Sequence, residues 1–334
     1  MRLRTKLAAA VALVLVTAVV VNAALARQDV AQFPPPGSLV AVAGHKLHLF
    51  CEGAGTPTVI LDAGLGGSSL YLRTIQRALK DSVRTCAYDR AGLGWSESGS
   101  GQLDVASSAN ELRELLRASK TPLPAVLVGH SLGANIAEYY AATFGADLAG
   151  VVLIDPGTTE DLLEDFDGTE AKAVAITTCG WKCTAAAAAA NLGVVRFATR
   201  KAGAKHMSRE DAAAYRAEIA RSSTQRAVVG AFEFLPKTAF QLRAVKSFGS
   251  VPVTIVYSEK TREPEGKETV ADVDAWHALT LDRMRALLRL TTHGRGPIIA
   301  PGVTHSTIVL DSAGVSTIVD ETLRLVRAAR LGSS

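Results

Sequence analysis

The sequence predicts an α/β domain of the doubly wound class, in which helices cover both faces of a mainly parallel sheet. Two observations support this prediction. Short apolar runs such as "PTVILDAG" and "PAVLVGH" are bounded by glycine or proline, which is typical of buried strands. Stretches of helical length separate these runs, and this alternation indicates parallel strands joined by helical connections.

Composition and charge narrow the class of protein. The 334 residues are 48% hydrophobic and 20% charged, as expected of a globular protein with a large core. Arg2, Arg4 and Lys6 lie at the extreme N-terminus, and without them the net charge falls from +4 to about +1. So small a charge argues against a nucleic-acid partner.

The N-terminus predicts export. "MRLRTK" is followed by an apolar stretch from Leu7 to Val21, and "NAALAR" offers Ala24 and Ala26 as the small residues of a cleavage site. Residues 1–26 are therefore interpreted as a signal peptide or an N-terminal membrane anchor, because about 20 apolar residues also suffice to span a bilayer. Since the positive charges stay inside, the body is expected to be secreted or held at the outer face of the cytoplasmic membrane.

The predicted core occupies residues 38–156 and 250–332, after a proline-rich lead-in over residues 27–37 in which "FPPPGS" is stiff and extended. "LVAVAGHKLHLFCEG" alternates apolar and polar residues around a glycine, which predicts a hairpin. Further strands are expected at "PTVILDAG", "VRTCAYDRAG", "PAVLVGH", "LAGVVLIDP", "VPVTIVYS" and "GPIIAPG". Helices are expected over residues 70–80, 105–120, 131–145, 270–290 and 312–330.

Residues 157–249 interrupt this alternation. The segment has no strand-like run, and it contains an alanine tract from Ala185 to Ala190 and amphipathic stretches such as "SREDAAAYRAEIARSS". Alanine is the strongest helix former. The segment is therefore predicted to be a helical insertion that covers the sheet as a lid.

"LVGHSLGAN" places Ser131 between Gly129 and Gly133, where a predicted strand becomes a helix. A nucleophile elbow needs this strand–turn–helix context, because the strained turn exposes the serine Oγ and tolerates only very small neighbours. The alternative is that Ser131 only caps the helix and that the glycines are ordinary turn residues. The downstream histidine and the upstream glycine-rich loop favour the nucleophile.

His305 is the candidate base. It follows the last predicted strand, and the carboxyl ends of parallel strands share one edge of the sheet, so His305 and Ser131 are expected to meet there. The side chain of His130, although adjacent to Ser131, is expected to point elsewhere. The remaining histidines are assigned to the hairpin, the cap, a helix or the opposite edge: His45, His48, His206, His277 and His293.

"DAGLGGSS" follows a buried strand and is rich in glycine, so its backbone can bend toward a ligand. We expect the backbone N–H groups of Leu65 and Leu132 to form an oxyanion hole. The loop matches no phosphate-binding pattern. The predicted chemistry needs no cofactor and no metal.

The four cysteines fit an oxidising compartment and predict two disulfides, Cys51–Cys86 and Cys179–Cys183. Buried unpaired thiols remain the alternative for the first pair. Their spacing does not match a zinc site.

Taken together, "VILDAGLGGSS", "CAYDRAGLGWS", "LVGHSLGAN", "VVLIDP" and "GVTHSTIVLD" resemble the motifs of the α/β-hydrolase superfamily in order and spacing. The likeness is to exported bacterial hydrolases of the epoxide-hydrolase and proline-iminopeptidase-like branch. The resemblance implies an eight-stranded, mostly parallel sheet with a helical cap after the sixth strand, and it implies Ser131 as nucleophile and His305 as base. It also implies that the second and fourth strands are neighbours, which supports the Cys51–Cys86 pairing.

The sequence departs from the family pattern at the acidic residue that should complete a triad with Ser131 and His305. Where the family places an aspartate after the seventh strand, the sequence reads "IVYSEKTREPEGKE", with Thr261 at the expected position. Asp155 at the end of the sixth strand is the preferred candidate and Glu259 is the alternative. Whichever residue serves must reach Nδ1 of His305 to orient the imidazole.

These residues predict a serine hydrolase that cleaves a small carboxylic ester through an acyl-enzyme. An aspartate-nucleophile mechanism is disfavoured because position 131 is a serine. An iminopeptidase or amidase is the first alternative, since cap carboxylates could bind a free amine: Asp161, Glu164, Asp165 and Asp167. A non-catalytic binding protein on the same fold is the second alternative.

Overall fold

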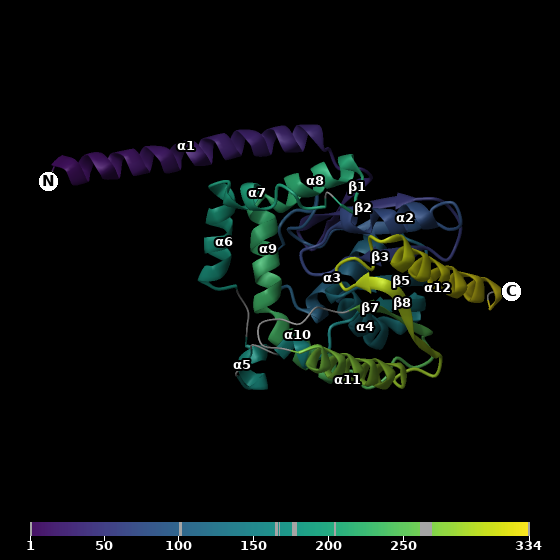
Figure 1. The fold of residues 1–334 in the computed structure, drawn as a ribbon. Coiled ribbons are helices and arrows are strands. Elements are labelled where there is room, and N and C mark those ends of the chain that lie inside the picture. Colours follow the sequence, from purple (N-terminus) through teal and green to yellow (C-terminus); the bar gives the residue numbers. More distant parts are fainter. Residues whose placement is uncertain are drawn as a thin grey trace.

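Eight strands form a single sheet in the order β1-β2-β4-β3-β5-β6-β7-β8 (Figure 1). β1 pairs with β2 and β2 with β4 in antiparallel fashion, and the other neighbours are parallel. The strands are β1 Ser38–Val42, β2 His45–Glu52, β3 Val59–Asp62, β4 Thr85–Tyr88, β5 Ala125–His130, β6 Leu148–Ile154, β7 Val253–Lys260 and β8 Gly294–Thr304. This computed structural model describes residues 2–99, 102–163, 166, 168–175, 179–203, 205–260 and 269–332.

Helices cover both faces of the sheet, as the sequence predicts. α3 (Val105–Ala118), α4 (Leu132–Phe144) and α11 (Val270–Leu288) pack on one face. α2 (Arg73–Leu79) and α12 (Ser312–Leu331) pack on the other face. Short 3-10 turns, η1 (Ser69–Leu72) and η2 (Gly145–Asp147), precede α2 and β6.

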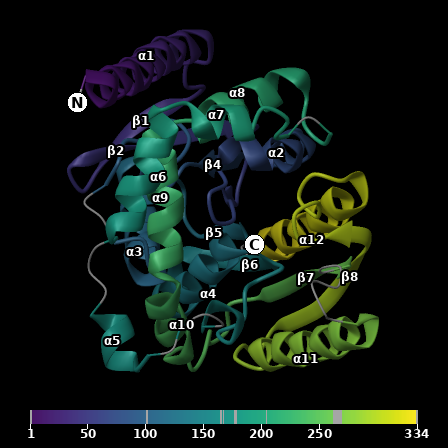
Figure 2. The same cartoon turned by 60° about the vertical axis from the view of Figure 1, so that its left-hand side comes forward.

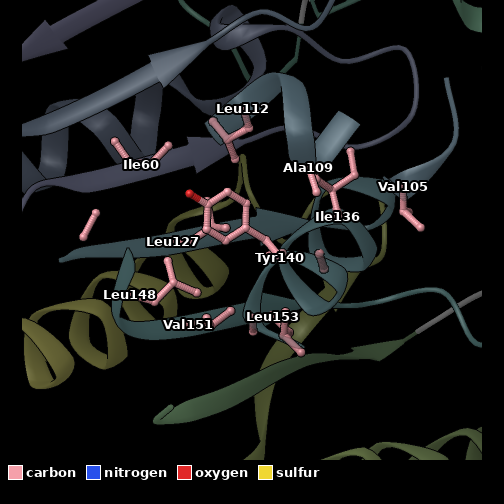
Figure 3. Close-up of a cluster of buried hydrophobic side chains, with 14 of the residues drawn as sticks. Ile60, Val105, Ala109, Leu112, Leu127, Ile136, Tyr140, Leu148, Val151 and Leu153 are labelled. Carbon is pink, nitrogen blue, oxygen red and sulfur yellow. The ribbon is translucent and has the colours of Figure 1, made fainter. Parts of the chain in front are cut away.

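The central strand β5 shows why these apolar runs form a buried parallel sheet. Ala125 and Leu127 face the cluster under α3 and α4, and Val126 and Val128 face the cluster under α12. Figure 3 shows the first cluster, in which the fully buried ring of Tyr140 lies near Leu127. Because both faces are covered, the strand is apolar at successive positions instead of alternating.

The expected helical cap follows β6 and precedes β7. Its elements are η3 Asp161–Leu163, α5 Glu170–Val174, α6 Trp181–Asn191, α7 Val194–Ala198, α8 Arg209–Ile219, α9 Ser222–Glu233 and α10 Leu235–Arg243. In Figure 2, α6 and α9 lie side by side at the left of the view, and α8 lies at the top, beside α7. The fold is thus the predicted α/β-hydrolase fold with its insertion after the sixth strand.

The N-terminal segment differs from the expected lead-in over residues 27–37. α1 runs from Arg2 to Gln32, so the helix continues past the predicted cleavage site and only the residues from Phe33 onward leave it. The physical reason is that "RQDVAQ" contains no glycine or proline, and the first helix-breaking residue is Pro34. By length and composition α1 could cross a membrane.

Both predicted disulfides are present. Cys51 and Cys86 are direct partners in the antiparallel register of β2 and β4, so the order of the strands brings them together. The Cys179–Cys183 disulfide lies at the start of α6 in the cap. The unpaired thiols considered for the first pair are therefore not what the structure shows.

Candidate active site

Ser131 lies at the turn between β5 and α4 with φ 53° and ψ −120°, a conformation that costs energy for any residue other than glycine. The two flanking glycines make the turn possible. A Cβ on Gly129 would lie 2.2 Å from the Gly133 carbonyl oxygen, and one on Gly133 would lie 2.4 Å from the carbonyl oxygen of Asp62. The glycines are thus required by close backbone contacts, as the sequence pattern indicates.

His305 meets Ser131 at the carboxyl edge of the sheet. It follows β8, and its Nε2 lies 3.0 Å from Ser131 Oγ. The distance suits a hydrogen bond from the hydroxyl to a neutral imidazole nitrogen. A serine in this geometry can pass its proton to the histidine as it attacks.

Asp155 lies behind His305. It follows β6, and its carboxylate Oδ2 lies 3.4 Å from His305 Nδ1, while Oδ1 accepts a 2.7 Å hydrogen bond from the backbone N–H of Ser258. Asp155 is 2% exposed. The alternative candidate, Glu259, directs its carboxylate to the backbone N–H of Gly302, 2.7 Å away. Of the two carboxylates, the structure brings Asp155 to the imidazole.

The glycine-rich loop after β3 lies against the turn. A Cβ on Gly64 would come within 3.2 Å of Ser131 Cβ, so the loop residue before Leu65 is close to the serine, and Leu132 is the first residue of α4 after it. Arg90 donates hydrogen bonds to the carbonyl oxygens of Ala63 and Gly64 and pairs with Asp62. Because Arg90 binds these carbonyls, the loop backbone is fixed before any charge develops on a substrate.

The side chain of His130 was expected to point away from the site, but it lies against His305. Its Nε2 lies 3.0 Å from the carbonyl oxygen of His305, and the two imidazole rings are 4.9 Å apart. Burial, and then the nearby charge of His305, lower the pKa of His130 to about 4, so it is neutral at pH 7. No local sequence pattern indicated this contact, because it depends on where the chain passes after β8.

Tyr71 supports the same segment from the other side. Its hydroxyl donates a 2.6 Å hydrogen bond to the carbonyl oxygen of Ser306, and its ring stacks near that of His130. Tyr71 was not predicted from the sequence, because a tyrosine in a helix following a glycine-rich loop carries no distinctive pattern. His130 and Tyr71 together fix the backbone that carries the His305 imidazole.

Glu218 links the cap to the core beside the site. From α8 its carboxylate accepts hydrogen bonds from Ser68 Oγ at 2.6 Å and from the Gly94 backbone N–H at 2.9 Å. Burial, with the charge of Asp89, raises the pKa of Glu218 to about 8. This contact was not predictable, because the cap sequence carries no motif that identifies its partner.

A cavity of about 630 Å³ lies between the cap and the core. Ala91, Leu103 and Ala227 line both this cavity and a smaller void that reaches Gly66 and Leu132. Small-molecule sites are clefts of roughly 300–1,000 Å³ that are often formed between such parts of a protein. The cavity therefore offers space for a small molecule between the cap and the loop after β4, and its lining includes neither Ser131 nor His305.

The cap carboxylates considered as an amine site fall into two groups. Asp161 accepts hydrogen bonds from the backbone N–H and the hydroxyl of Thr158, which makes it a local turn residue. Glu164, Asp165 and Asp167 lie outside the described residues. Within the described ranges, no group of three or more His, Cys, Asp or Glu side chains is arranged to hold a metal ion.

The strand order, the cap after β6 and the strained turn at Ser131 are those of an α/β hydrolase. A family model described as "Alpha/beta hydrolase family" matches residues 53–317. The chain belongs to this family.

Similar proteins agree with this assignment. The uncharacterized protein YqjL of Bacillus subtilis is 32% identical over 105 residues, which cover 31% of this chain and 42% of YqjL, so the match spans less than half of that relative. The epoxide hydrolase CorEH has a TM-score of 0.61 at 18% identity, covering 86% of this chain and 97% of CorEH. A thermophilic esterase from Thermogutta terrifontis has a TM-score of 0.56 at 17% identity, covering 86% and 98%. At such identities the two solved structures are evidence for the fold alone.

Proposed function

We propose that this protein is an exported serine hydrolase that cleaves a small carboxylic ester. The observation that carries the proposal is the pair of distances at His305, 3.0 Å from Nε2 to Ser131 Oγ and 3.4 Å from Nδ1 to the Asp155 carboxylate. In this arrangement one imidazole nitrogen accepts a proton from the serine and the other faces a buried carboxylate. Asp155 thereby holds the tautomer that leaves Nε2 free and stabilises the imidazolium when it forms.

The reaction proceeds through an acyl-enzyme. Ser131 Oγ attacks the ester carbonyl as His305 takes its proton, and the backbone N–H groups of Leu65 and Leu132 stabilise the oxyanion. His305 then gives the proton to the leaving alcohol. Water, deprotonated by His305, attacks the acyl-enzyme, and His305 returns this proton to Ser131 Oγ as the bond to the acyl group breaks and the acid leaves. The chemistry uses only this chain's own groups and takes no cofactor or metal.

The alternatives are less well supported. Epoxide opening by an attacking carboxylate would need an acid at position 131, where this chain has a serine. An iminopeptidase needs an acidic site for a free amine, and Asp161, the one candidate for it among the described residues, is engaged by Thr158. A non-catalytic binding protein would have no need to keep a strained Ser131 within reach of a histidine.

The proposed organisation is a core of residues 38–156 and 250–332 with a cap over 157–249. The two disulfides support an oxidising compartment outside the cytoplasm. The N-terminal segment acts either as a signal peptide or as an anchor. An anchor is favoured because Asn22, which lies before the expected cleavage site, donates a hydrogen bond to the carbonyl oxygen of Ala190 in the cap. The exported hydrolases of the epoxide-hydrolase and iminopeptidase-like branch remain the proposed close kin.

A fluorophosphonate probe tests the proposal, because it labels only an activated serine. We expect the wild-type protein to be labelled and Ser131→Ala to be unlabelled. Ser306→Ala is the matched control, since Ser306 is an exposed serine next to His305 whose side chain has no role in the scheme. Equal labelling of the wild type and Ser131→Ala contradicts the proposal. A panel of p-nitrophenyl esters and aminoacyl amides, compared by kcat/KM, then distinguishes an esterase from an amidase.

A further inference from the structure

One face of α1 is bound to the cap. Its partly or fully buried residues are spaced three or four apart, Ala18, Asn22, Ala26 and Asp29. Asn22 donates a 2.9 Å hydrogen bond to the carbonyl oxygen of Ala190 at the end of α6, and Arg196 of α7 donates to Asn22 Oδ1 at 3.0 Å. Arg196 also pairs with Asp29 at 2.7 Å. The polar contacts thus fix the C-terminal half of α1 on α6 and α7.

The rest of α1 projects beyond the cap. Residues 3–17 are exposed, and the apolar stretch ends at Val21, directly before Asn22. At about 1.5 Å per residue, the stretch from Leu3 to Val21 is about 28 Å long, close to the thickness of the hydrocarbon core, with the side chains of Arg4 and Lys6 reaching back to the headgroups. In Figures 1 and 2, α6 runs crosswise to α1, and Figure 1 shows the N-terminal end of α1 extending past α6. A membrane crossed by α1 would therefore lie along the cap.

The side of the cap around α6 and α7 carries exposed apolar side chains. Trp181 is 77% exposed, Phe197 is 70% exposed and Val194 is 56% exposed. Tryptophan and phenylalanine at such positions are favoured at the boundary between lipid headgroups and acyl chains. Large exposed apolar residues gathered on one part of a surface point to an interaction site.

The positive charge of residues 171–209 favours an anionic partner. Residues 171–209 contain no acidic residue and seven basic ones, namely Lys172, Lys182, Arg196, Arg200, Lys201, Lys205 and Arg209. Two of them are paired, Arg196 with Asp29 and Lys182 with Glu233. Arg200, Lys201 and Lys205 are exposed at the end of α7 and just after it. Basic residues mixed with aromatic ones complement a surface of anionic lipid headgroups.

We propose that Trp181, Val194, Phe197, Arg200, Lys201 and Lys205 form a membrane-binding surface that lies on anionic phospholipid, with α1 retained as the anchor. α1 crosses the bilayer, with Arg2, Arg4 and Lys6 on the cytoplasmic side. Asn22 holds the ends of α6 and α7 at the outer boundary. The cap then lies flat on the outer leaflet, so the hydrolase body has a fixed orientation instead of swinging on a tether.

Tryptophan fluorescence of the full-length chain in lipid nanodiscs tests this surface. The discs contain phosphatidylcholine with or without phosphatidylglycerol, and some of the lipid is brominated near the headgroup, where bromine quenches nearby tryptophans. The variants leave the apolar stretch of α1 unchanged, so α1 is expected to insert in all of them. Differences in Trp181 quenching therefore report how close the cap lies to the lipid. The emission of Trp181 is the difference between the wild type and Trp181→Phe, and we expect brominated discs with phosphatidylglycerol to quench most of it.

Variants separate the two parts of the surface. Arg200→Gln is expected to lower the equilibrium constant for binding of the cap to lipid about fivefold, the factor that corresponds to about 1 kcal/mol per basic residue. Arg289→Gln, an exposed arginine in the core outside the cap, is the matched control and should leave quenching unchanged. Asn22→Ala, which removes the contact of α1 with Ala190 and Arg196, should also reduce quenching.

Three results overturn the proposal. The first is equal Trp181 emission in brominated and unbrominated discs, which is also the result expected if a protein instead of lipid covers the surface. The second is equal loss of quenching in Arg200→Gln and Arg289→Gln. The third is a mature protein whose mass lacks residues 1–26, because the anchor would then be absent. None of these measurements depends on ester hydrolysis, so a failure here is distinct from a failure of the proposed activity.

Discussion

Ser131 and Asp155 stand at the carboxyl ends of two neighbouring parallel strands, and both have positive φ angles, 53° and 43°. The backbone N–H of Ser131 donates a 2.9 Å hydrogen bond to the carbonyl oxygen of Ile154, so the ladder of β5 and β6 continues to the residue before Asp155. Each strand therefore ends in a sharp turn that directs a polar side chain toward His305. This pairing explains how the end of the sixth strand can supply the acid.

Asp155→Asn should lower kcat by roughly 10³- to 10⁴-fold, because an amide cannot stabilise imidazolium and can hold the wrong tautomer. The Asp155 carboxylate accepts a hydrogen bond from the backbone N–H of Ser258. The amide side chain of the variant could keep this bond through its carbonyl oxygen, so the fold should survive. The measurement is kcat on a p-nitrophenyl ester, with thermal unfolding as a check on folding.

Glu259→Gln is the control for this prediction. The Glu259 side chain accepts a hydrogen bond from the Gly302 backbone N–H, and glutamine can accept the same bond. We expect the kcat of Glu259→Gln to lie within about twofold of the wild type, since substitutions of exposed residues that keep their hydrogen bonds have small effects. A large loss in Glu259→Gln with near wild-type rates in Asp155→Asn would reverse the assignment.

Gly133→Ala should damage both activity and stability. Its Cβ would lie 2.4 Å from the carbonyl oxygen of Asp62, so the backbone must shift, at a cost of about 1–3 kcal/mol for overpacking. A displacement of the turn should lower kcat by roughly 10²-fold, because catalysis depends on near-ideal geometry. Gly180→Ala is the control, since a Cβ there meets nothing within 4 Å. Kinetics and thermal unfolding are measured for both variants. Equal kcat and equal thermal stability of Gly133→Ala and Gly180→Ala would contradict the prediction.

The sheet and the Ser131–His305 pair were predictable because their signals are local. A buried strand, a glycine-rich turn and a helix each have a sequence pattern, and parallel strands bring their carboxyl ends to one edge. The Cys51–Cys86 pairing follows from the strand order, which the structure confirms.

Other features depend on contacts between distant segments and have no local signal. The partner of Glu218 is Ser68 in the core, 150 residues away in sequence. The side-chain direction of His130 depends on where the chain passes after β8, which no pattern in β5 encodes. The end of α1 at Gln32 was not predicted. A cleavage-site pattern does not say where the helix that contains it ends, and here the residues after the site continue the helix.

The two disulfides should contribute unequally to stability. Cys51 and Cys86 are 35 residues apart and Cys179 and Cys183 only 4, so the first crosslink restricts the unfolded chain far more. By chain entropy, replacing both cysteines with alanine should cost about 4 kcal/mol for the first pair and about 2 kcal/mol for the second. Denaturant unfolding of the two double-alanine variants measures the difference. An equal loss, or a larger loss for the cap disulfide, would contradict this expectation.

The buried carboxyl of Glu218 should make stability depend on pH. Its folded pKa is about 8 against an ordinary value of 4.5, so the folded state holds the proton more tightly than the unfolded state. The resulting stabilisation is complete below pH 4.5 and is lost as the pH rises through 8. Between pH 6 and pH 8 the free energy of unfolding should fall by about 2 kcal/mol from this group.

Glu218→Gln does not titrate and can still form hydrogen bonds with Ser68 and Gly94, so its free energy of unfolding should lack this fall. Glu210→Gln, an exposed residue on the same helix, should keep it. Chemical denaturation at pH 6 and 8 compares the three proteins, and parallel pH profiles for the wild type and Glu218→Gln would show that Glu218 is ionised in the folded state.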